Sequence, residues 1–162
     1  MSGSGVTMSI SLLEVAHLTD LIEQFVELLS TGSTSDPAVA RLVPDAYRGD
    51  PEAAQEFRGL TQDDLLTRRS EDARIVLASL LHDGEPVRIG TLDRVEAERE
   101  LVVRVEGATT NAWLRTLAAL RLVMAERLGV TDESDDRSDD ARYGVYEWLA
   151  YRLEGLVQAL DS

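Results

Sequence analysis

Few side chains in this 162-residue sequence are suited to covalent or metal chemistry. It has no cysteine, and all 16 basic residues are arginine, so the chain offers neither a thiolate nor a lysine amine as a nucleophile. The absence of cysteine also excludes disulfides, iron–sulfur clusters and cysteine zinc sites. The sequence also lacks a glycine-rich phosphate loop, a nucleophile elbow and a His-Glu-x-x-His zinc motif. We therefore expect a non-enzymatic binding or regulatory protein without a cofactor or metal.

One of the two histidines has a spacing that also occurs in metal sites. Glu14 and His17 stand three residues apart in a predicted helix, as in carboxylate-bridged di-iron bundles. Such a site needs a second Glu-x-x-His pair, and neither the helix predicted at 112–128 nor the last helix contains a histidine. We interpret Glu14 and His17 as surface residues near the start of a helix.

The 30 acidic residues are the remaining candidates for chemistry. Two carboxylates can act as general acid and base without any other residue type, so a carboxylate-dependent hydrolase is the alternative to a regulator. No spacing singles out one pair. The acidic segment 131–142 lacks the central glycine of a calcium loop and carries Arg137, which would place a cation where the ion binds. We predict a solvated acidic loop there.

The net charge of -14 narrows the choice of partner. An acidic surface repels a phosphate backbone, so we expect no direct nucleic-acid binding. The same surface attracts the basic faces of other proteins. Residues 1–5 are typical of a flexible leader rather than a signal peptide, and the longest apolar run, residues 75–81, is too short to span a membrane. We expect a cytoplasmic protein with no membrane contact.

A group of arginines around one tyrosine is the candidate partner contact. Tyr47 lies in a polar turn, where it could project as an aromatic anchor of the kind that dominates interfaces. The alternative is that Tyr47 fills space between two short helices and that the arginines neutralise nearby acidic residues. The candidate contact residues are Arg41, Tyr47, Arg48, Arg58, Arg68 and Arg69.

The first half of the chain shows one strand pattern followed by helical patterns. Residues 6–10 alternate apolar and polar side chains, which is typical of a strand. Ser11 and Glu14 form a capping box that begins an amphipathic helix, which we expect to end at Gly32. An aspartate followed by a proline predicts short helices over 37–43 and 51–58. Thr61 predicts the start of a longer helix that ends near Leu81.

The second half returns to a strand and then to helices. Residues 87–89 and 101–105 are strand-like, and the charged segment 93–100 between them fits either a hairpin arm or a loop. Helices are predicted from Thr109 or Thr110 to 128 and over 143–160. The expected fold is mainly α: one helical domain over 6–162, with three longer and two short helices. A small two-stranded or hairpin-extended β element pairs residues 6–10 with 101–105.

Several segments resemble an actinobacterial family of uncharacterised proteins that includes the oxidative-stress transcriptional regulator AosR. The resemblance extends over nearly the whole chain from residue 6 and keeps the order of its motifs. The segments that carry it are residues 41–48 (RLVPDAYR), 56–61 (EFRGLT), 111–115 (NAWLR) and 145–149 (VYEWL).

The resemblance implies a cytoplasmic regulator that acts on transcription through a protein partner. A sigma factor, a polymerase subunit or a Clp protease component is the implied partner, because family members are described as neighbours of a Clp adaptor. A homodimeric adaptor linked to Clp proteolysis is a further alternative. Independently of the resemblance, an obligate homodimer that pairs through exposed parts of the last helix is a third interpretation. Sensing through thiols does not carry over, because this chain has no cysteine.

Overall fold

The computed structural model describes residues 5–31, 37–40, 42, 51–128 and 141–161. Six helices, two strands and one 3-10 turn lie within these ranges, and the mainly α fold class is confirmed. In chain order the elements are β1 (Val6–Ser11), α1 (Leu12–Thr31), α2 (Pro37–Ala40), α3 (Pro51–Ser79), η1 (Ile89–Thr91), α4 (Arg94–Glu98), β2 (Glu100–Val105), α5 (Ala108–Leu128) and α6 (Ala141–Asp161).

Four of the described helices are long, one more than the expected three. The observed helix bounds differ most from the expected ones at α3. Residues 51–58 and 61–81 were expected as two helices, but α3 runs without a break from Pro51 to Ser79. Thr61 therefore lies inside the helix and does not cap it. No proline follows Pro51 within α3, and a single interior glycine such as Gly59 costs a helix only about 1 kcal/mol. That penalty is too small to end a helix.

The two strands form the expected pair, and the pairing is antiparallel. Val6 is opposite Val105 and Ser11 is opposite Glu100, so all six residues of β1 pair with β2. The predicted pairing of residues 6–10 with 101–105 is thus confirmed. The alternation of side chains fixes its register, because a shift by one residue would turn the buried face towards the solvent.

The predictions for the segment before β2 were wrong. Residues 87–89 form no strand; only Val87 is buried there, and a 3-10 turn begins at Ile89. The segment 93–100 contains α4 rather than a hairpin arm.

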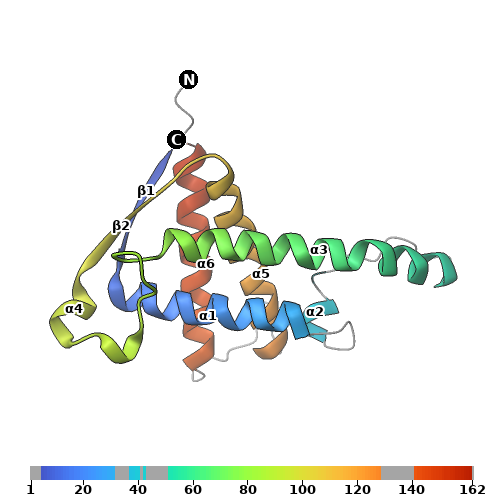
Figure 1. The fold of residues 1–162 in the computed structure, drawn as a ribbon, viewed down its shortest axis with the longest axis horizontal. Helices are drawn as coiled ribbons and strands as arrows, with labels where there is room; N and C mark the ends of the chain where they lie inside the picture. Colours follow the sequence, from blue (N-terminus) through green and yellow to red (C-terminus); the bar gives the residue numbers. More distant parts are fainter. Residues whose placement is uncertain (1–4, 32–36, 41, 43–50, 129–140, 162) are drawn as a thin grey trace.

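The helices pack in two crossing layers (Figure 1). The helices α1 and α3 lie side by side, and α5 and α6 cross behind them. Buried side chains from β1, β2 and all four long helices form one hydrophobic cluster. The most completely buried large side chains of this cluster are Trp113, Ile10, Leu18, Ile22, Leu80, Leu117, Leu149 and Leu156.

A hydrogen-bonded relay lies at the contact between α3 and α5. Trp113 is 1% exposed, and its indole N–H donates to Ser79 Oγ at 2.9 Å. Ser79 Oγ in turn donates to the carbonyl oxygen of Val76 at 2.6 Å. The relay satisfies a buried donor that would otherwise destabilise the core.

We expect Ser79→Ala to destabilise the protein by about 1 to 3 kcal/mol, because it leaves the Trp113 N–H buried without an acceptor. Trp113→Phe should also destabilise it, through a lost hydrogen bond and a small cavity. The double variant should lose less than the sum of the two single losses, since both hydrogen-bonding partners are then gone. Urea unfolding of the four proteins measures this coupling, and strictly additive losses would contradict it.

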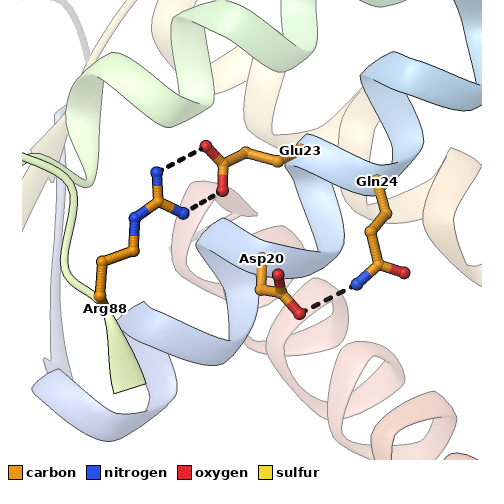
Figure 2. A network of polar contacts seen from close by, with 4 residues as sticks. All are labelled: Asp20, Glu23, Gln24 and Arg88. Atoms are coloured by element: carbon orange, nitrogen blue, oxygen red, sulfur yellow. Dashed lines mark hydrogen bonds and ion pairs between the residues drawn. The ribbon is translucent and has the colours of Figure 1, made fainter. Parts of the chain in front are cut away.

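An ion pair attaches the connection after α3 to α1 (Figure 2). The guanidinium of Arg88 holds both carboxylate oxygens of Glu23, and its Nη2 donates to Oε2 at 3.0 Å. Gln24 donates to the Asp20 carboxylate at 2.9 Å one turn away. The hydrogen bond from Arg88 lowers the pKa of Glu23 below its usual value of 4.5.

This pair contributes stability that depends on pH. Because the pKa of Glu23 is lowered in the folded state, its contribution is present above pH 4.5 and is lost as the pH falls through the lowered pKa. We expect Arg88→Met to lower the unfolding midpoint at pH 7, and the difference from wild type to shrink below pH 4.5. Thermal melts at several pH values measure it. A difference that stays constant with pH would contradict the ion-pair account.

Candidate functional site

The predicted arginine and tyrosine contact lies largely outside the described residues. Arg41, Tyr47 and Arg48 fall there, as does segment 129–140, which includes most of the predicted acidic loop. For Arg58 only the backbone, inside α3, is described.

The two described members of that set occupy different environments. Arg68 is exposed and pairs with Asp64 of its own helix, at 3.3 Å. Arg69 is half-buried, and burial lowers the pKa of its guanidinium. Successive residues of a helix point about 100° apart, so the two side chains do not share a face. The contact formed by the whole set stays a prediction.

The carboxylates with opposite pKa shifts lie at the exposed start of α4. The backbone N–H of Glu96 donates to the Asp93 carboxylate at 2.8 Å and lowers the pKa of Asp93. The neighbouring Asp93 side chain raises the pKa of Glu96. Both residues are exposed, and neither lines the cavities described below. This arrangement is that of a helix cap rather than an acid–base pair in a cleft.

A cavity of about 310 Å³ separates the first half of α1 from the start of α6. Its wall includes Glu14 and His17, the pair with metal-site spacing, together with Leu21, Val145 and Trp148. The Glu14 carboxylate forms an ion pair with Arg152, and its backbone N–H donates to Ser11 Oγ at 3.2 Å, as expected for a cap. Within the described ranges, no three His, Asp or Glu side chains group closely enough to hold a metal ion.

A second, apolar groove of about 560 Å³ lies between α1 and α5. Phe25, Leu28, Val123 and Met124 form much of its wall. It meets the first cavity at Leu21 and Val145, which line both.

A third groove, of about 510 Å³, lies between β1 and α6 and is the candidate site. We refer to it below as the β1–α6 groove. Its strand wall is formed by four consecutive residues, Val6, Thr7, Met8 and Ser9. One edge of β1 pairs with β2, and the sheet in the described part of the chain has only these two strands. Because four consecutive residues of β1 line the groove together with α6, we infer that the other edge of β1 borders it.

The helix wall of the β1–α6 groove combines an exposed aromatic ring with open space. Tyr151 is 70% exposed although it lies on a packed helix. Gly155, one turn further along, has nothing within 4 Å of the position where a Cβ would be. Leu156 closes the groove towards the core.

The charged side chains at this wall give the groove a net negative charge. Arg152 pairs with Glu14 of α1, and its guanidinium also lies 5.9 Å from the centre of the Tyr151 ring. Its positive charge is thus already engaged inside the protein. Glu154 lines the groove and accepts a hydrogen bond from the amide of Gln158 at 3.3 Å. The carboxylate of Glu154 is exposed and not neutralised by any ion pair in the described residues.

Sequence reasoning did not identify Tyr151, Glu154 or Gly155 as site residues. A signal was present, because a glycine inside a predicted helix weakens that helix and often marks a close approach or an open surface. The lack of charge in residues 6–10 was a second signal, since exposed edge strands usually carry charges.

We expect Arg152→Met to destabilise the protein by about 1 to 2 kcal/mol, because the half-buried ion pair with Glu14 links α6 to α1. This magnitude lies between the smaller loss from breaking an exposed ion pair and the larger loss from breaking a fully buried one. Arg68→Met is the matched control, since its pair with Asp64 is exposed and lies within one helix. That control should change stability by less than about 0.5 kcal/mol. If Arg152→Met and Arg68→Met lose the same free energy of unfolding in denaturant, the ion pair between α1 and α6 does not stabilise the position of α6.

Comparison with known proteins gives a family but no function. No helix among the described residues is both long and apolar enough to cross a membrane. No curated protein and no solved structure is significantly similar to the chain. A family model described as a domain of unknown function, DUF2017, matches residues 1–160. The chain therefore belongs to the DUF2017 family.

Proposed function

We propose that this protein is a non-enzymatic regulator that acts by binding a protein partner at the β1–α6 groove. The observation that carries the proposal is the edge of β1 that pairs with no strand among the described residues and borders a groove next to the exposed ring of Tyr151. The composition supports it, because the chain lacks the cysteine and lysine nucleophiles of many covalent mechanisms.

An unpaired strand edge is a recognised place for protein contact. Its free N–H and C=O groups can pair with another chain, and proteins usually prevent this with charged side chains, proline or bulges. The strand β2 carries Glu100 and Arg104, whereas β1 has the uncharged sequence VTMSIS. β1 carries no charge or proline and pairs in continuous register without a bulge, and a groove of about 510 Å³ lies between it and α6, so its edge favours pairing with a partner chain.

The acidic character of the protein supports a basic partner. Its net charge of -14 would speed encounter with a positively charged surface and oppose binding to DNA. The resemblance to the regulator AosR, and through it to actinobacterial proteins, extends the proposal to a cytoplasmic stress-response role. A sigma factor, a polymerase subunit or a Clp component would then be the partner. The signal would not be a disulfide, because the chain has no cysteine.

Affinity capture followed by reconstitution tests this function. The full chain, immobilised and incubated with a native extract, should retain a transcription or proteolysis component, and the purified component should bind the pure protein in calorimetry. Tyr151→Ala should weaken that binding by at least about tenfold, as for an aromatic interface anchor. The control Tyr146→Phe changes a half-buried tyrosine outside the groove and should not weaken it.

Two results would contradict the proposal. One is the absence of any captured component that rebinds after purification. The other is turnover of a small molecule by the pure protein, which would favour the carboxylate-dependent hydrolase instead.

A further inference from the structure

We infer that the partner contributes an extended, basic segment that joins β1 as a third strand and places a cationic side chain against Tyr151 and Glu154. This inference rests on the proposed function and adds the conformation and charge of the bound segment.

The pairing of β1 determines which backbone groups are free. In an antiparallel pair, alternate residues exchange hydrogen bonds with the neighbouring strand, and the residues between them direct N–H and C=O groups to the other side. All six residues of β1 are in register with β2, so the free groups alternate along the opposite edge. An extended peptide can bond to that edge along residues 6–9, which line the groove, whereas a helix cannot because its own backbone groups are already paired.

The groove leaves room for such a strand. A third strand would lie about 4.8 Å from β1. The space beside β1 has a volume of about 510 Å³, and α6 borders it at Gly155 and Ala159, which have no bulky side chains. The open position above Gly155 allows a side chain of the added strand to pack against the helix there.

The charge of the groove favours a basic segment. The carboxylate of Glu154 is exposed, while Arg152, the cation of the groove among the described residues, is engaged by Glu14. Arg152 lies 5.9 Å from the centre of the Tyr151 ring, but Tyr151 is largely exposed, so its ring can also take a cation–π contact with an arginine or lysine of the partner. A basic side chain at this position therefore finds a carboxylate and an aromatic ring together.

The same charges disfavour a second copy of this chain. Two β1 strands could pair with each other, since both are uncharged. That pairing would bring two Glu154 side chains and two molecules of charge -14 towards one another, and like charges oppose association. A basic partner removes this repulsion.

A set of synthetic peptides tests the inference on the full-length protein. The probe is a nine-residue peptide, acetylated and amidated, that alternates arginine with valine or threonine. One control has glutamate in place of arginine, and another has N-methyl groups on its central backbone nitrogens, which removes the strand donors. We expect the arginine peptide to bind at least about tenfold more tightly than either control, with an affinity that falls as salt rises.

Variants of Gly155 test the location. Gly155→Leu should weaken binding by at least about tenfold because it fills the groove, while the smaller Gly155→Ala should leave binding within about threefold of wild type. Ala118→Leu, at an exposed site of α5, is the control for enlarging a helix surface residue. Glu154→Gln should weaken binding of the arginine peptide at low salt and have little effect at high salt. Circular dichroism confirms that each variant is folded.

Three results would overturn the inference. The first is equal affinity for the arginine and glutamate peptides. The second is a dimer in analytical ultracentrifugation that Gly155→Leu converts to a monomer, because the occupant would then be a second copy. The third is a purified natural partner that binds wild type and Gly155→Leu equally well, in which case the protein still acts by binding a partner but the β1–α6 groove is not the site.

Discussion

The position of α6 beside β1 rests on its packing against α5 in the core and on one ion pair to α1, between Arg152 and Glu14. These residues are 138 positions apart in the sequence, and their contact places the last helix beside the first strand without covering its edge. The same ion pair engages Arg152, the arginine that lines the groove among the described residues. One half-buried interaction thus helps to hold α6 and also leaves the candidate site negatively charged.

The hydrophobic core keeps this arrangement rigid enough to be a site. Side chains of β1, β2 and the four long helices belong to one cluster, so the strand pair and α6 are supported by the same core. Trp113 and Ser79 join α3 to α5 within it, and Arg88 attaches the following connection to α1. A partner strand would thus add to a preorganised edge, which lowers the entropy lost on binding.

Sequence periodicity predicted the elements that depend on local pattern, and it failed where the fold brings distant residues together. The cap at Ser11, the amphipathic helices and the strands over 6–10 and 101–105 follow from local spacing. The break expected before Thr61 was wrong because local cap signals are weak compared with the continuity of a long helix. Tyr151 and Gly155 were missed because only the tertiary structure sets them beside β1.

Amide hydrogen exchange of β1, with and without the bound partner, tests the central claim most directly. The account predicts that amides of residues 6–9 which exchange quickly in the free protein become protected on binding, while amides in the core of α3 do not change. Binding that leaves exchange in β1 unaltered would contradict strand addition at this edge.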